Sequence, residues 1–190
     1  MLMGLLGLVG LIVIVLAIVA AVGIIIYNSL VGLRQRVQNA WAQIDVQLKR
    51  RHDLVPNLVN AVKGIMAHER EILERVTQAR TSAISAGNNL AARSQAENEL
   101  TGAMRSLFAV AESYPAIQSN ENMLALQEEL SSTENRIAFA RQFYNDAVMD
   151  YNTAQQQFPA VLFAANLGFR TADTFALDDE AARTVPTVSF

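Results

Sequence analysis

Cysteine is absent from the sequence, and histidine occurs only at positions 52 and 68. Without cysteine, the chain can form no disulfide framework, no thiolate nucleophile and no cysteine-ligated metal site. His68 also lacks a second histidine four residues later, the spacing that places two imidazoles on one face of a helix. We therefore expect both histidines to be solvated or helix-capping residues, and we expect no metal and no cofactor.

The residue patterns of common active sites are missing as well. The sequence has no glycine-rich loop that could hold a phosphate and no glycine-flanked serine of the kind that serves as a nucleophile. Neither Glu128-Glu129 nor the pair Asp146 and Asp150 is accompanied by the Glu-x-x-His motifs of di-iron helical bundles. We predict that the chain is not an enzyme and has no catalytic, cofactor-binding or metal-binding residues.

Polar and charged side chains are absent from residues 1–26, and the first charge is Arg34. A helix of this length spans about 39 Å, more than the ~30 Å hydrocarbon core of a bilayer, so the run predicts a tilted transmembrane helix. The alternative is a cleaved signal peptide, with Val19 and Ala21 as the small residues before the cleavage point. Signal peptides begin with basic residues and have a shorter apolar segment, so we expect an uncleaved anchor.

Basic residues follow the apolar run and set the expected orientation. Arg34, Arg36 and residues 49–51 lie beyond it, opposed in that stretch by Asp45 alone. By the positive-inside rule, the N-terminus lies outside and the remainder of the chain is cytoplasmic. Arg34 and Arg36 are closest to the span, and we predict that they contact lipid headgroups.

The two parts of the chain differ in charge. Residues 1–63 carry six basic and two acidic side chains, whereas residues 64–190 carry nine basic and sixteen acidic ones. The basic part is nearest the membrane, where anionic lipids attract it. The acidic excess of the remainder argues against a nucleic-acid-binding surface.

Small residues recur along one side of the expected span at alternating steps of three and four. Small side chains let helices approach closely in lipid, although glycine and alanine are also common in membrane helices generally. We predict a self-association face made of Gly7, Gly10, Ile14, Ala17 and Ala21.

Apolar residues recur every three to four positions from residue 30 onward, which is the spacing of amphipathic helices. Helices are predicted up to about residue 85, over 90–114 and over about 120–157, with Asn120 or Ser119 as the cap of the last. We predict an all-α fold, in which an N-terminal transmembrane helix precedes an antiparallel up-and-down bundle of about four long helices. The expected divisions are an anchor (1–26), a helical bundle (27–169, in which 160–169 forms a short helix or strap) and an extended acidic tail (170–190).

Pro56 interrupts an otherwise unbroken apolar phase. Asp53 could cap a new helix with Pro56 in its first turn, where the missing N–H costs nothing. The phase also fits one long helix kinked at Pro56. We favour two helices that meet near residue 52, with Lys49-Arg50-Arg51 as a solvated basic turn.

Tyr-Asn pairs occur at positions 27–28, 144–145 and 151–152. Tyrosine and asparagine at inward-facing positions need hydrogen-bond partners, which other helices can supply. A ligand- or peptide-recognition patch is the alternative interpretation. The predicted interhelical polar network consists of Asp45, Arg51, Asn57, Asn135, Tyr144, Asn145, Tyr151 and Asn152.

Several local motifs are more specific than this periodicity. They are Ala40-Trp41-Ala42-Gln43-Ile44-Asp45, Asp53-Leu54-Val55-Pro56-Asn57-Leu58, Glu112-Ser113-Tyr114-Pro115, Glu134-Asn135-Arg136-Ile137 and Tyr144-Asn145-Asp146-Ala147-Val148. In these motifs, and along nearly its whole length, the sequence resembles the LemA family. The resemblance implies a bacterial protein with one N-terminal span and a helical-bundle domain, and it supplies no catalytic residues.

These features favour a non-enzymatic, membrane-anchored scaffold that self-associates through its span and its helical bundle. The alternative is an adaptor or regulator of another membrane protein, such as a quality-control protease, docking through residues 160–169 and the acidic tail. The expected partners are membrane lipid and further copies of the chain, with another membrane protein in the alternative, and not nucleic acid. With the resemblance, the expected location is the bacterial inner (cytoplasmic) membrane, crossed once.

Overall fold

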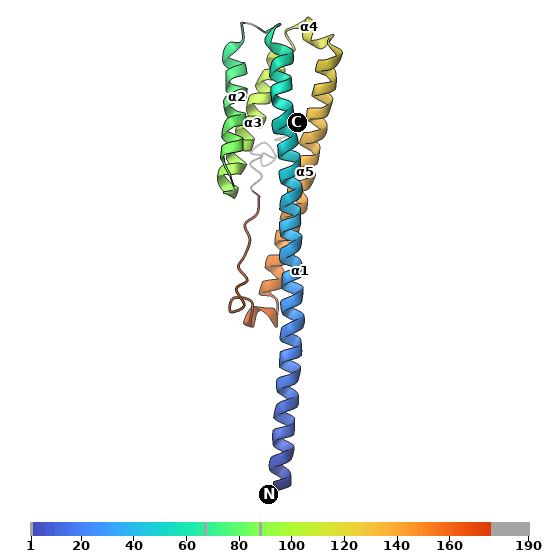
Figure 1. Ribbon diagram of the computed structural model, residues 1–190, viewed down its shortest axis with the longest axis vertical. Helices are drawn as coiled ribbons and strands as arrows, with labels where there is room; N and C mark the ends of the chain where they lie inside the picture. The colour runs from blue at the N-terminus through green and yellow to red at the C-terminus, as the bar shows by residue number, and fades with distance from the viewer. Residues whose placement is uncertain (1, 67, 88, 176–190) are drawn as a thin grey trace, which may run out of the picture. The chain divides into compact units, whose positions relative to one another are not determined.

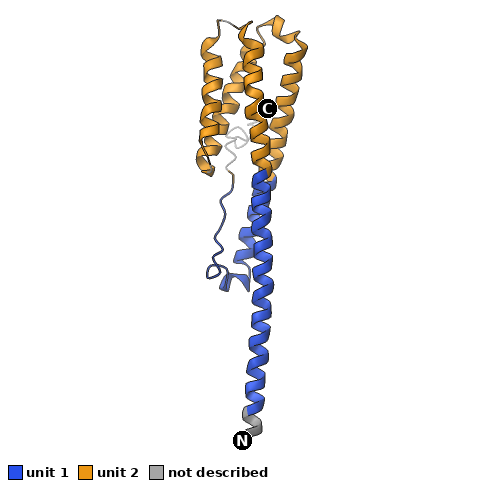
Figure 2. Cartoon of the chain, in the orientation of Figure 1, with its two compact units in different colours: residues 1–42, 143–174 blue, residues 43–142, 175–190 orange. Residues whose placement is uncertain are grey.

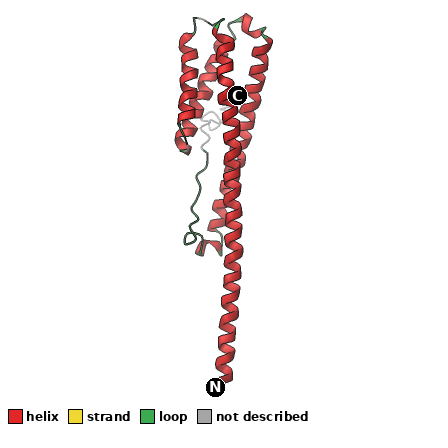
Figure 3. Ribbon diagram, viewed as in Figure 1, coloured by secondary structure: helices red, strands yellow, loops and turns green. Residues whose placement is uncertain are grey.

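Helices make up most of the described part of the chain. The computed structural model describes residues 2–66, 68–87 and 89–175, with side chains from residue 6 onward. The all-α prediction is confirmed, because no strand occurs in these ranges, while most of the predicted acidic tail (176–190) lies outside them. The elements are α1 (Leu2–Lys63), α2 (Arg70–Ser85), α3 (Leu90–Ala111), α4 (Pro115–Gln118), α5 (Glu121–Gln156) and a short 3₁₀ helix, η1 (Ala160–Leu162) (Figures 1 and 3).

The chain divides into two compact units, each built from segments that are distant in the sequence (Figure 2). Unit 1 contains residues 1–42 and 143–174, and unit 2 contains residues 43–142 and 175–190. Helices α1 and α5 contribute to both units, whereas α2, α3 and α4 belong to unit 2. The two units are defined by contacts within the chain, and they do not test the predicted boundaries between anchor, bundle and tail. Those boundaries stay predictions.

Unit 2 is an antiparallel helical bundle with an apolar core. Short connections join its successive helices, so that neighbours in sequence run antiparallel (Figure 1). The core includes Leu58, Val62, Val76, Leu100, Leu107, Met123 and Leu130. Burying one such valine, leucine or methionine side chain stabilises the fold by about 1.5–3 kcal/mol relative to leaving it exposed.

Polar caps and proline fix the helix ends in unit 2. Asn89 Oδ1 accepts a hydrogen bond from the Ala92 N–H (3.0 Å), and Asn120 Oδ1 accepts one from the Met123 N–H (3.2 Å). Each bond satisfies a first-turn N–H that has no partner within its helix. The predicted cap at Asn120 is therefore confirmed, and Pro115 starts α4, where its missing N–H costs nothing.

Helix α1 does not end where the sequence analysis placed a break. It is a single helix of 62 residues that contains Pro56 in its interior. The predicted junction near residue 52, with Asp53 as an N-cap, is wrong, and the alternative of one continuous helix is the one observed. The chain reverses direction instead in the connection between Lys63 and Arg70.

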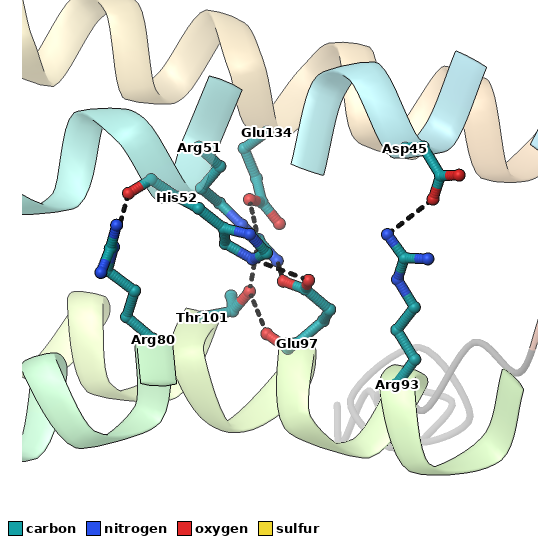
Figure 4. A network of polar contacts seen from close by, with 8 residues as sticks. All are labelled: Asp45, Arg51, His52, Arg80, Arg93, Glu97, Thr101 and Glu134. Carbon is teal, nitrogen blue, oxygen red and sulfur yellow. Dashed lines mark hydrogen bonds and ion pairs between the residues drawn. The ribbon is translucent and has the colours of Figure 1, made fainter. Parts of the chain in front are cut away.

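A side chain from α2 explains how α1 passes Pro56. Proline has no N–H, so the carbonyl four residues earlier, that of His52, loses its helical hydrogen bond. Arg80 of α2 supplies a replacement donor, because its Nε lies 2.6 Å from the His52 carbonyl oxygen (Figure 4). A tertiary contact thus satisfies the backbone group that the local sequence leaves open.

Unit 1 combines α1 with the end of α5 and a returning segment. After α5, residues 157–169 form a compact turn around η1, which we call the apolar turn. Residues 170–174, which we call the strap, then run back along α5 (Figure 1). Gly168 has a φ of +80°, a conformation that glycine adopts without strain, and this allows the turn to lead into the strap.

A double-mutant cycle tests the compensation at Pro56. Arg80→Met keeps the aliphatic stem but removes the donor, and should lower the free energy of unfolding by about 1–3 kcal/mol, the cost of an unsatisfied buried carbonyl. In a Pro56→Ala background, the restored N–H bonds the His52 carbonyl, so the same substitution should cost much less. The measurement is chemical denaturation of the full chain in detergent micelles, and equal costs in both backgrounds would refute the compensation.

Candidate functional site

A buried ionic cluster lies at the centre of unit 2, around the guanidinium of Arg51 (Figure 4). Arg51 is on α1 and is fully buried. Its Nη1 donates to Glu134 Oε2 of α5 (2.7 Å) and to Thr101 Oγ1 of α3 (3.0 Å), and its Nη2 donates to Glu97 Oε2 of α3. One side chain therefore joins three helices through charge-assisted hydrogen bonds.

The helical phase explains why these charged residues face inward. Arg51 stands between Leu48 and Val55 on the buried side of α1, and Glu97 continues the buried series of Leu100 and Leu107 on α3. A charge held at such a position must be paired, because an uncompensated buried ion costs several kcal/mol. The cluster has a signal in the sequence. In each of the three helices, one charged residue stands at a position where the helical spacing of the apolar residues predicts a buried side chain.

Glu97 is the most enclosed acidic residue of the cluster. Its Oε1 accepts a hydrogen bond from His52 Nε2 (2.9 Å), while its Oε2 accepts from Arg51. Burial alone would raise the pKa of Glu97, but the hydrogen bond from His52 and the positive charge of Arg51 outweigh it and hold this pKa below 4.5. Glu97 is consequently ionised in the folded protein at neutral pH.

Two further arginines lie in unit 2 near this cluster. Arg141 is buried and stacks on the ring of Phe175 (4.6 Å to the centroid). Burial and the like charge of Arg51 lower the pKa of Arg141 from its usual range, against the opposing effect of the two glutamates. Arg93 of α3 pairs with Asp45 of α1 (2.6 Å), adding a second ionic link between these helices (Figure 4).

Two predictions about α1 are corrected by this geometry. His52 was expected to be solvated or capping, but it is buried against Glu97. Arg51 was expected to belong to a solvated turn, but it lies in a helix and is fully buried, while its neighbours Lys49 and Arg50 are exposed. Both errors follow from the expected break near residue 52, which would have placed these side chains in a loop.

A second set of polar contacts, in unit 1, holds the strap against α5. Asn152 donates from Nδ2 to the Ala172 carbonyl and accepts from the Ala172 N–H, both at 2.9 Å. Tyr144 donates its hydroxyl to the Asp173 carbonyl (3.0 Å) and packs its ring against Trp41 (5.5 Å between centroids). Burial, and then the charge of Asp173, raise the pKa of Tyr144, which keeps the hydroxyl protonated as a donor.

The structure distributes the residues of the predicted polar network over several environments. Asp45 and Arg51 form the ion pairs of unit 2, whereas Asn57 and Asn135 are exposed. Tyr144 and Asn152 bind the backbone of the strap, Tyr151 is buried in unit 1 and Asn145 is half-buried. The polar residues of unit 2 that were not predicted from the sequence are Glu97, Thr101, Glu134, Arg80, Arg93 and Arg141.

The predicted membrane-facing residues are also placed. Gly7, Gly10, Ile14, Ala17 and Ala21 are all exposed within the chain, and a Cβ atom added at Gly7 or Gly10 would meet no atom within 4 Å. The Arg34 guanidinium lies 5.5 Å from the centroid of the Phe169 ring, and Arg36 lines a shallow groove with Phe143 and Asp146.

Comparison with known proteins gives one family and a small set of relatives. The LemA family profile matches residues 40–190. Magnetosome protein MamQ 2 and Magnetosome protein MamQ 1 of Paramagnetospirillum magneticum are each 28% identical over 174 residues, covering 78% of this chain and 64% of theirs. Magnetosome protein MamQ of Magnetospirillum gryphiswaldense is 26% identical over the same extent. The chain therefore spans less than two thirds of the length of these relatives.

Glu97→Gln should destabilise the protein by about 3 kcal/mol at neutral pH, because Arg51 would stay buried with one carboxylate fewer. Glu129→Gln is the matched control. Glu129 forms an exposed ion pair (2.8 Å) with Arg50, the residue that precedes Arg51. That substitution should change the stability by less than about 0.5 kcal/mol. Chemical denaturation of the full chain in detergent micelles measures both, and equal effects would contradict the importance of the buried pair.

The free energy of unfolding should also depend on pH, through the ionisation of Glu97. Because the folded-state pKa of Glu97 lies below 4.5, its ionised form favours the folded protein; this contribution is present above pH 4.5 and is lost as pH falls through the folded-state pKa. Glu97→Gln should remove this part of the acid sensitivity, and Glu129→Gln should retain it. If both variants lost stability in parallel as the pH falls, Glu97 would not be the residue responsible for the acid sensitivity.

Proposed function

The chain belongs to the LemA family, and from that premise we propose that it is a non-enzymatic membrane scaffold whose copies associate through the span and the helical bundle. It is a membrane-associated protein. Among the described residues, α1 is long and apolar enough to cross a membrane, with a mean hydropathy of 3.3 over its most apolar window. None of that window is buried by the other residues that the structure describes.

The unpartnered span is the observation that carries the proposed self-association. Residues 6–22 are exposed among the residues that the structure describes, and a Cβ added at Gly7 or Gly10 on the small-residue face would meet no atom within 4 Å. In lipid, such a face lets a second helix approach closely enough for backbone packing. No break interrupts α1 between the span and the bundle, so a contact formed in the membrane is continuous with the helix that enters unit 2.

The bundle offers surface for the same association. Val46 on α1 and Phe139 on α5 are large apolar side chains of unit 2 that remain well exposed. We propose that further copies of the chain cover these two side chains, which would add to the contacts of the span. The proposed assembly is thus a homo-oligomer held both in the bilayer and at the bundle surface.

The chemistry of the buried cluster supports a role without catalysis. Both carboxylate oxygens of Glu97 are engaged, one by Arg51 and one by His52. Within the described residues, no group of three or more histidine, cysteine, aspartate or glutamate side chains is arranged to hold a metal ion. The names of the MamQ relatives state no reaction.

The proposed location is the bacterial inner membrane, with the N-terminus outside and the bundle in the cytoplasm. Arg34, Arg36, Lys49 and Arg50 all follow the span and are exposed. This excess of positive charge favours the cytoplasmic side. The proposed partners are accordingly membrane lipid and further copies of the chain, and the acidic remainder of the sequence disfavours nucleic acid.

Site-directed crosslinking in native membranes tests the scaffold. The chain has no cysteine, so Ile14→Cys places one thiol on the small-residue face, and Leu16→Cys places one on the opposite side of the helix. Mild oxidation should give a disulfide-linked dimer with Ile14→Cys and much less with Leu16→Cys. Adding Gly10→Leu to Ile14→Cys should abolish the dimer, because the larger side chain blocks the close approach of a second helix. A Cβ at position 10 meets no described atom of the chain itself within 4 Å.

The outcomes separate the scaffold from the adaptor. Equal and low crosslinking from both positions would refute self-association through this face. If chemical crosslinking then joined the chain to one different membrane protein, with no adduct of two copies, the adaptor function would replace the scaffold.

A further inference from the structure

The apolar turn leaves large hydrophobic side chains uncovered. Phe158 is 80% exposed, Leu162 59%, Val161 51% and Leu167 45%. No charged residue occurs anywhere in residues 151–169, and the run is bracketed by Asp150 and Arg170. An uncharged, aromatic-containing and exposed surface of this kind marks a site of contact with another apolar phase.

The turn lies beside the end of the expected span. The ring of Phe169 packs edge-on against that of Tyr27, the first polar side chain after the apolar run of residues 1–26 (5.6 Å between centroids). Gly23 and Ile26 are half-buried, whereas residues 6–22 are exposed. Figures 1 and 2 show this within unit 1: the turn meets α1 partway along, and the N-terminal part of the helix continues beyond it.

The residues around this contact are those of a membrane interface. Tyrosine and phenylalanine rings pair with an arginine here, since the Arg34 guanidinium lies over the Phe169 ring. Tyrosine and tryptophan collect at the headgroup level of bilayers, and arginine side chains there reach toward the polar headgroups. Arg36 and Arg170 are exposed in the same unit and add two positive charges to it.

We propose that the apolar turn is a second membrane-contacting element, which inserts Phe158, Val161 and Leu162 into the interfacial layer of the leaflet from which α1 emerges. The occupant of this surface is lipid, because the turn lies where a membrane-spanning α1 leaves the hydrocarbon core. The inference rests on the proposed function in one respect, namely that residues 1–26 span the bilayer. It adds that two separate segments of the chain contact the membrane, namely the span and a turn more than a hundred residues later in the sequence.

Spin labels on single cysteines test the depth of the turn. Leu162→Cys places the label on the turn, Leu16→Cys places it in the span on the side opposite the small-residue face, and Met149→Cys places it on α5 at an exposed apolar position of the same unit. The full chain is reconstituted in vesicles of phosphatidylcholine with a minority of phosphatidylglycerol. Power saturation then compares collisions with oxygen, which enriches in lipid, and with a water-soluble nickel chelate.

The label at 162 should collide with oxygen more than with the chelate, as the label at 16 does, and the label at 149 should show the reverse. If 162 behaves like 149 while 16 is in lipid, the turn is in water and the inference fails, although the span stands. If 162 is shielded from both reagents, a protein contact covers the turn and the lipid assignment is overturned. If 16 is in water, the span itself fails and the inference fails with it.

Discussion

The hydrogen bond from Arg80 to the His52 carbonyl is the contact on which the rest of unit 2 depends, because it lets α1 stay helical past Pro56. A helix that ended near residue 52 would present different side chains to the bundle on either side of the break. With the helix intact, one apolar face runs from Leu48 to Val62 without a change of phase. The same continuity directs Arg51 into the core.

The buried cluster fixes how the continuous helix α1 is aligned along α3 and α5. An ion pair in a protein interior contributes little net stability, since desolvation offsets most of the attraction, but an unpaired buried charge is costly. A slip of any helix by one turn would separate Arg51 from Glu97 or Glu134 and leave a charge without a partner. The cluster therefore selects one arrangement of α1, α3 and α5 more than it strengthens the bundle as a whole.

Much of this architecture is predictable from the sequence, because it follows from local patterns. The apolar N-terminal run, the period of the amphipathic helices and the cap at Asn120 can each be read from neighbouring residues in the sequence. The family was likewise identified from its motifs, and the profile match confirms it. Such signals need no knowledge of which helices meet.

The errors arise where a distant group decides the local structure. Pro56 looks like a helix start because nothing nearby indicates that Arg80 will replace its missing hydrogen bond. Asn152 and Tyr144 were assigned side-chain partners, but they bind backbone carbonyls of the strap, and a carbonyl acceptor has no sequence signature. These residues needed the tertiary fold before their roles could be recognised.

The central claim is that α1 is one helix through Pro56, and a distance measured along it tests this most directly. Spin labels at Gln43→Cys and Asn60→Cys, both exposed sites on α1 within unit 2, flank the proline in a chain with no other cysteine. A continuous helix places their Cα atoms about 26 Å apart. A reversal near residue 52 would instead bring them to about 10 Å, the separation of the axes of packed helices. A pulsed electron-spin resonance distance near the longer value is the predicted result, and one near the shorter value would contradict the account.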